Sequence, residues 1–182
     1  IGVGDNVVDR YVYLGKMFPG GNSVNFAVYA NQLGHKSAYM GVLAEDIEGM
    51  AIINALTDIG VDISHSERLK NGETGRCSIH LVNGDRIITD DNDFGSVKSN
   101  PLKITKEKAD YIAQFDVVHS SCYSFLDSEL HKIKKVRVPI VYDFSDKWTE
   151  EIFLKVCPNI DIAFFSGKKL PDKEIKEYMV ET

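Results

Sequence analysis

The chain has 182 residues, 43% of them apolar, and a formal net charge of −6 with a pI near 5.4. That length and apolar fraction suit one domain with a substantial core. The acidic balance argues against a nucleic-acid surface, and no apolar run approaches the length of a membrane span. We therefore expect neither nucleic acid nor membrane as a partner.

The cysteines and histidines argue against disulfide and metal chemistry. The three cysteines lie far apart in apolar segments, which fits buried thiols in a reducing, cytoplasmic compartment. The five histidines lack the spacing of metal ligands. The acidic loop Asp90-Asp91-Asn92-Asp93 is more typical of a solvated turn than of a metal site. No metal-binding residue is predicted.

The first third of the chain alternates strand and helix patterns. Apolar periodicity and glycine stops predict a strand at 1–3, a β-rich run at 7–14, a helix at 23–33 ended by Gly34, a strand at 37–43 and a helix at 46–59 ended by Gly60.

Residues 72–92 interrupt this alternation. Residues 75–82 alternate apolar and polar side chains, as a half-buried strand does. Asn83-Gly84 is a strong hairpin signal, and residues 86–89 return as the partner strand. The segment therefore predicts an antiparallel hairpin.

The strand–helix alternation then resumes. It predicts a helix at 105–114 capped by Thr105, a strand at 117–120, a helix at 126–135, a strand at 139–144, a helix at 150–156 capped by Thr149, a strand at 160–165 and a helix at 171–180. Such repetition predicts a parallel sheet covered on both faces. Ligands of these sheets bind beyond the carboxyl ends of the strands.

A glycine pair opens the first predicted helix. Gly20 and Gly21 allow a tight turn and close approach to a ligand, and the helix start behind them offers unpaired N–H groups. The amides of Asn22 and Asn25 are suited to binding hydroxyl groups. The alternative is a plain glycine turn with Asn22 or Ser23 as the N-cap.

Acidic residues follow several predicted strands. Asp9, just past the first strand, can accept two sugar hydroxyls or be a surface turn acid. The cluster at 143–148 either contacts substrate or phosphate or caps the next helix. Asp46 follows another strand end, where it can serve as an N-cap alone.

A dinucleotide-binding fingerprint is the rival interpretation of the first turn. Gly2-Val3-Gly4 follows the opening strand, but Val7 stands where the third glycine of G-x-G-x-x-G belongs. The next segment is β-rich rather than helical. A hydride-transferring dehydrogenase is therefore disfavoured.

Several motifs, in order and spacing, resemble the amino-terminal part of the ribokinase/PfkB carbohydrate kinases. They are G-D-N-V-V-D (4–9), G-G-N-S-V-N-F-A (20–27), G-V-L-A-E-D-I-E-G (41–49) and G-V-D-I-S (60–64). Within that family, A-Q-F-D-V-V-H (113–119) and D-F-S-D-K-W (143–148) are similar to the fructoselysine kinases. The resemblance implies a ribokinase-like three-layer α/β sandwich with a parallel central sheet, and a small β lid formed by residues 7–19 and 72–92.

The resemblance also implies roles for individual residues. It implies ATP as phosphate donor, Mg²⁺ as companion ion and a sugar or sugar–amine as acceptor, most closely fructoselysine. The implied substrate-binding residues are Asp9, Gly20, Gly21, Asn22, Asn25 and Tyr123, and the phosphate-side residues are Lys147 and Ser166. Lids in this family often pair between subunits, which implies a homodimer.

Two departures from the family bear on activity. The family's G-A-G-D, which supplies the catalytic base, does not occur in this sequence, so the base is expected beyond Thr182 in a longer protein. The family's N-x-x-E falls at Ser166-Gly167-Lys168-Lys169, where lysine replaces glutamate. The alternatives left open are a non-catalytic sugar-binding module or pseudo-kinase, and a kinase for fructose, ribose or ketodeoxygluconate.

Overall fold

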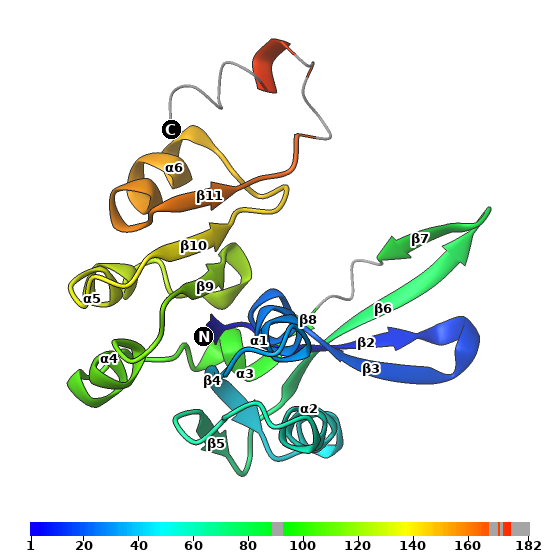
Figure 1. Cartoon of the computed structure of the whole chain (residues 1–182). Coiled ribbons are helices and arrows are strands. Elements are labelled where there is room, and N and C mark those ends of the chain that lie inside the picture. Colours follow the sequence, from blue (N-terminus) through cyan, green and yellow to red (C-terminus); the bar gives the residue numbers. More distant parts are fainter. Residues whose placement is uncertain (89–92, 168–170, 172, 176–182) are drawn as a thin grey trace.

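A computed structural model describes residues 1–88, 93–167, 171 and 173–175. Within that part of the chain, six strands form a sheet in the order β11-β10-β9-β1-β4-β5 (Figure 1). Neighbouring strands pair in parallel, as predicted. The strands are β1 (Gly2–Gly4), β4 (Tyr39–Ala44), β5 (Glu67–Leu69), β9 (Val118–Ser121), β10 (Ile140–Asp143) and β11 (Ile162–Phe164).

Helices cover both faces of this sheet. One core cluster joins the sheet to α1 (Asn22–Gln32) and α2 (Ile47–Asp58) through residues such as Val24 and Leu56. The other joins it to α4 (Lys106–Ile112), α5 (Leu130–Lys134) and α6 (Glu150–Val156). Burial of apolar side chains on both faces is what stabilises a parallel sheet. The three-layer α/β architecture is therefore confirmed.

A second, smaller sheet projects away from the first (Figure 1). Its strands are β2 (Val7–Tyr11), β3 (Lys16–Gly20), β6 (Thr74–Val82) and β7 (Asp85–Ile88), in the order β3-β2-β6-β7, and β8 (Asp93–Phe94) also pairs with β6. The β6–β7 pair is the predicted antiparallel hairpin. Asn83 and Gly84 have φ of 53° and 88°, the turn conformation that Asn-Gly favours.

Several boundaries differ from the predictions. The β-rich run at 7–14 becomes β2 followed by a short 3₁₀ helix, η1 (Val12–Leu14). The helix predicted at 126–135 is shorter, since α5 begins at Leu130. The short elements β3, β5, β8 and α3 (Gly95–Ser99) were not predicted. Most of the predicted helix at 171–180 lies outside the described residues.

The described helices bear on membrane association in one way. None of them combines the length and the apolarity that a transmembrane helix requires.

The chain changes direction across the large sheet beside β1. From β1 it builds outward to β4 and β5, then returns to β9 on the other side of β1 and continues to β10 and β11. The carboxyl ends of β1 and β9 therefore flank a topological switch point, where open α/β sheets bind their ligands.

Candidate active site

The glycine pair brings Asp9 against the start of α1. Gly20 ends β3, and Gly21 precedes α1 with φ of 106°, a backbone conformation that favours glycine. A Cβ on Gly20 would lie only 2.9 Å from Asp9 Oδ2. The missing side chain at Gly20 therefore lets the half-buried Asp9 carboxylate, on β2, lie directly beside the turn into α1.

A carboxylate from the end of β1 caps α1. Asp5 is 2% exposed; its Oδ2 accepts from the Asn22 N–H (2.5 Å), and its Oδ1 accepts from the Ser23 N–H (3.3 Å) and Oγ (2.9 Å). An anion there satisfies unpaired N–H groups and complements the helix dipole. The alternative prediction of Asn22 or Ser23 as N-cap is wrong: Gly21 holds that position and Asp5 supplies the acceptor.

The two amides of the loop have different surroundings. Asn22 Nδ2 donates to Asp143 Oδ2 (2.9 Å), and Asp143 Oδ1 accepts from the Ser145 N–H (2.7 Å). Asn25, in the first turn of α1, is exposed. Asn22 therefore ties the loop to the carboxyl end of β10, whereas the Asn25 side chain is open to solvent.

Tyr123 lies in the 3₁₀ helix η2 (Cys122–Ser124), directly after β9. Its hydroxyl donates to Ser145 Oγ (3.0 Å), and its ring stacks on Phe94 with a centroid separation of 5.4 Å. Burial raises the pKa of Tyr123, which keeps the hydroxyl protonated. Because Phe94 belongs to β8, Tyr123 connects the edge of the large sheet with the small sheet.

The predicted phosphate-side residues follow β10 and β11. The Ser166 N–H donates to the Ser145 carbonyl (2.7 Å), and the Ser166 carbonyl accepts from Trp148 Nε1 (3.1 Å). The Lys147 side chain is 62% exposed, and its Nζ lies 3.9 Å from Asp146 Oδ1. Such an exposed ion pair is weak, so the ammonium group is accessible to an anion.

A buried polar group fixes the chain as it leaves the large sheet. Asn6 Nδ2 donates to the Tyr39 hydroxyl (2.7 Å) and the Val42 carbonyl (2.8 Å), and the Tyr39 hydroxyl donates to the Gly4 carbonyl (2.7 Å). Burial raises the pKa of Tyr39 far above its ordinary value. These bonds join the carboxyl end of β1 to the neighbouring strand β4.

Cys122, at the same edge, is a structural thiol. Burial first, and then the charges of Asp143 and Asp5, raises its pKa to about 12. The neutral thiol donates to the Phe144 carbonyl at 3.3 Å. A protonated thiol is a poor nucleophile.

Asp46 caps α2 and also anchors the small sheet. Its Oδ1 accepts from the Gly49 N–H (2.7 Å) and Thr74 Oγ1 (2.6 Å), and its Oδ2 accepts from the Thr74 N–H (2.8 Å). Burial acts to raise the pKa of Asp46, but these hydrogen bonds outweigh it and leave the pKa below its ordinary value. The predicted N-cap is confirmed, and β6 begins on the same carboxylate.

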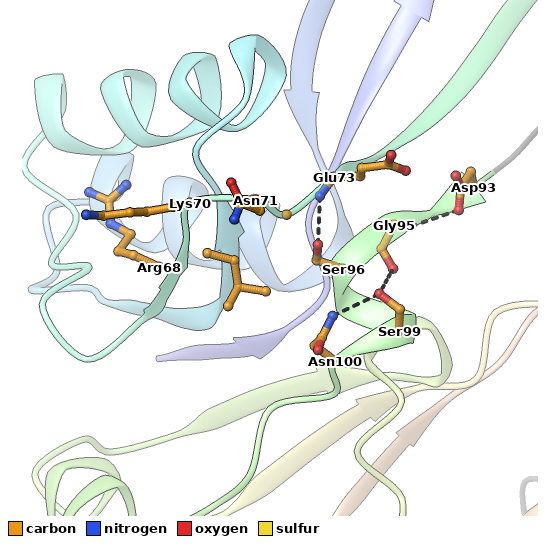
Figure 2. A pocket seen from close by; sticks show the side chains of 11 residues that line it. Arg68, Lys70, Asn71, Glu73, Asp93, Gly95, Ser96, Ser99 and Asn100 are labelled. Atoms are coloured by element: carbon orange, nitrogen blue, oxygen red, sulfur yellow. Dashed lines mark hydrogen bonds between the residues drawn. The ribbon is translucent and has the colours of Figure 1, made fainter.

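A polar recess of about 630 Å³ lies between β5 and α3 (Figure 2). Charges of both signs line it, among them Arg68, Lys70 and Glu73. Ser96 Oγ accepts from the Glu73 N–H at 2.8 Å. Its lining residues differ from those predicted to bind sugar, so it lies apart from the glycine loop.

The described residues do not by themselves form a metal site. Within them, no group of three or more His, Cys, Asp or Glu side chains is placed to hold a metal ion. Residues 90–92 of the acidic loop and Lys169 lie outside the described part. Mg²⁺ is commonly held by one or two carboxylates together with substrate phosphates, so this finding concerns only a site made entirely of protein ligands.

The structure places several of the predicted residues in contact with one another or with a shared neighbour. Asp9 lies beside Gly20, Asn22 reaches the end of β10, and Tyr123 and Ser166 both bond Ser145. Lys147 and Asn25 have exposed side chains.

Sequence reasoning missed the buried side chains that hold these residues together. They are Asp5, Asn6, Ser121 and Ser124, and the half-buried Phe94 stacks on Tyr123 beside them. The acid immediately after the first strand was the available signal for Asp5.

Residues 7–170 match the sequence model of the pfkB family of carbohydrate kinases. The chain is 35% identical over 178 residues to fructosamine kinase FrlD of Bacillus subtilis (strain 168), covering 97% of this chain and 62% of the relative. It is 31% identical over 165 residues to fructoselysine 6-kinase of Escherichia coli (strain K12), covering 91% of this chain and 62% of that relative. The chain therefore spans about three fifths of the length of these curated relatives.

Solved structures share the fold at low sequence identity. Arabidopsis thaliana ribokinase complexed with ribose and ATP aligns with a TM-score of 0.81 at 20% identity, over 98% of this chain and 66% of that one. Xylella fastidiosa fructokinase aligns with a TM-score of 0.72 at 16% identity, over 98% of this chain and 62% of that one. These likenesses support the ribokinase-like fold.

Proposed function

Since this chain belongs to the pfkB family of carbohydrate kinases, we propose that the protein transfers the γ-phosphate of ATP to a hydroxyl of a glycated amine, with fructoselysine as the favoured substrate. The observation that carries the proposal is the close approach of the Asp9 carboxylate to Gly20 beside the start of α1, where an added Cβ would lie 2.9 Å from Asp9 Oδ2. It gives a hydroxyl acceptor and a side-chain-free backbone on one surface, beside the switch point of the sheet.

Sugar hydroxyls suit this surface. The Asp9 carboxylate is suited to accept charge-assisted hydrogen bonds from two sugar hydroxyls. Asn25 presents both donor and acceptor atoms from an exposed position on α1. Gly20 and Gly21 admit the sugar ring close to the backbone, and Tyr123 lines the pocket from η2.

Lys147 and Ser166 form the phosphate side in this proposal. The accessible Lys147 ammonium is suited to pair with phosphate oxygens of ATP. Mg²⁺ is proposed from the family alone, because the carboxylates described here do not complete a site for it. Phosphoryl transfer depends on positioning and charge stabilisation, and these are what the named residues supply.

The small sheet serves as the lid in this proposal. Asp46 anchors β6 at Thr74, and Phe94 of β8 contacts Tyr123, so both sheets meet at the site. Closure of the sheet over the sugar excludes water, which otherwise competes as phosphate acceptor.

The substrate class rests on the curated relatives. Two relatives at 35% and 31% identity are named fructosamine kinase and fructoselysine 6-kinase. The reducing, cytoplasmic location expected from the cysteines agrees with an ATP-dependent enzyme. We propose that location for this protein as well.

A panel assay of the complete gene product tests the function. ADP release is measured with fructoselysine, fructose, ribose and ketodeoxygluconate, with free lysine as the negative control. Highest kcat/KM on fructoselysine supports the proposal. Faster turnover of another sugar refutes the substrate, and sugar binding without ADP release favours the non-catalytic binding module.

A further inference from the structure

We propose that Asp5 is a positioning residue that sets the affinity for the sugar, an inference that rests on the proposed function. Its carboxylate joins the glycine loop at the start of α1 to the wall that carries Tyr123. At 2% exposure Asp5 does not itself face a ligand. Its effect on binding therefore passes through the groups that it holds.

On one side, Asp5 holds the sugar loop. Its two oxygens accept from the N–H groups of Asn22 and Ser23 at 2.5 and 3.3 Å, and from Ser23 Oγ at 2.9 Å. Ser23 Oγ also lies 3.1 Å from the Val3 carbonyl. These bonds fix the first turn of α1, on which Asn22 and Asn25 stand.

On the other side, Asp5 holds η2. Oδ1 accepts from Ser121 Oγ and Ser124 Oγ, each at 2.9 Å. The Asp5 N–H lies 3.1 Å from Ser124 Oγ, and Ser121 Oγ accepts from the Tyr123 N–H at 3.2 Å. The Ser121 hydroxyl thus links the Tyr123 N–H to the carboxylate that fixes the loop, through two successive hydrogen bonds.

The chemistry of these contacts requires an acceptor without protons. The groups that face the carboxylate are N–H groups and hydroxyls, and a carboxylate offers only lone pairs to them. In Asp5→Asn, an NH₂ group of the same shape would face some of these donors. Burial prevents water from replacing the lost bonds, so the loop and η2 would move apart while the fold persists.

Steady-state kinetics of Asp5→Asn in the complete gene product tests this role. We expect KM for fructoselysine to rise about tenfold or more, with KM for ATP within about twofold of wild type. Ser124→Ala, which removes one of the joining bonds and is less disruptive, is expected to raise the same KM by a smaller factor. Calorimetric titration with fructoselysine gives Kd independently of turnover.

Glu129→Gln is the matched control. Glu129 is also a buried carboxylate, but its Oε2 accepts from the Ile104 N–H and from Lys132 Nζ, both at 2.8 Å. This variant should lower the unfolding midpoint without changing KM or Kd for fructoselysine. If Asp5→Asn and Ser124→Ala also lower the unfolding midpoint without changing KM or Kd for fructoselysine, Asp5 has only a structural role and the inference is overturned.

The failure of the proposed function is a separate result. A wild type that binds fructoselysine without ADP release refutes the kinase, and the Kd of Asp5→Asn then decides the inference. A wild type that neither binds nor phosphorylates fructoselysine overturns both.

Discussion

Single carboxylates dominate the candidate site, and they differ in what they touch. Asp9 lies half-buried beside Gly20 at the surface proposed for the sugar, whereas Asp5 is buried behind it. The first is expected to act on a ligand directly and the second through the chain. Substitutions at the two positions separate these effects.

Asp9→Asn is expected to raise KM for the sugar about tenfold or more, because the amide loses charge-assisted bonds to hydroxyls. KM for ATP should change little. Initial rates in the complete gene product measure both. Asp110→Asn, an exposed acid on α4 that pairs with Lys106, is the control. Equal KM values for wild type and Asp9→Asn would remove Asp9 from the sugar site.

His119 gives the large sheet a pH-dependent contact. Its ring stacks on Phe26 of α1 at 4.9 Å, and its Nδ1 is buried without a partner in the described structure. Burial lowers the pKa of His119 from 6.5. Because the folded state favours the neutral ring, this contact contributes fully above the unfolded pKa and is lost as pH falls toward the folded pKa.

His119→Gln should therefore flatten the dependence of stability on pH. Urea unfolding of wild type is expected to show a lower midpoint near pH 5.5 than near pH 7.5, and the variant should show a smaller difference. His35→Gln, at an exposed position, should retain the wild-type difference. An equal difference between the two urea midpoints in His119→Gln and wild type would show that His119 is not the source of the pH dependence.

Local sequence rules found the residues whose roles are local. Thr105, Thr149 and Asp46 cap the helices that follow them, as their positions predicted. The residue that caps α1 was not predicted, because Asp5 lies 17 residues before Asn22 in the sequence. Its partners Ser121 and Ser124 are still farther away in the chain, so a contact of this kind needs the tertiary fold.

At the scale of elements, the small sheet carries the proposed closure. Its β6–β7 hairpin ends in the Asn83-Gly84 turn, and its base rests on the Asp46 carboxylate. A sheet held at its base and free at its turn is suited to move as one piece over a bound sugar.

Deletion of residues 83–86 should lower kcat about tenfold or more, because the shortened hairpin no longer excludes water from the transfer step. The comparison is kcat at saturating fructoselysine. Asn83→Gly retains a residue that tolerates positive φ and should leave kcat near wild type. Normal turnover in the deletion variant would dismiss the lid.

The hairpin and the parallel strands β1, β4, β9 and β10 were predicted, whereas the edge strands β3 and β5 were not. β3 contains Pro19 and ends in Gly20, both unfavourable in strands, and exists because it pairs with β2. β5 is three residues long and is fixed by pairing with β4. Pairing, rather than local preference, decides such segments.

For the whole molecule, exposed apolar side chains on the small sheet and η1 suggest a second copy as partner. They are Val12, Tyr13, Leu14, Met17, Phe18, Leu81, Val82, Ile87 and Ile88. Exposed apolar groups of this extent on one small sheet and its η1 connection are typical of interfaces. We accordingly propose a homodimer that forms through this sheet.

Phe18→Glu should shift the protein from dimer to monomer, because a carboxylate placed in an apolar interface costs desolvation. Phe18 is 46% exposed, and Leu154 of α6, at 73%, is the control site. Sedimentation velocity of both glutamate variants measures the shift. A monomeric wild type, or equal dissociation in Leu154→Glu, would refute the interface.

The switch point also constrains the order of events during synthesis. β1 is made before the other strands of the large sheet. Ser121, in the neighbouring strand β9, and Ser124 are made 116 and 119 residues after Asp5, whose carboxylate their hydroxyls meet. Contacts between such distant segments form slowly. One side of the central strand therefore stays open on the nascent chain until β9 emerges from the ribosome, and this open edge is where aggregation or chaperone binding is expected to begin.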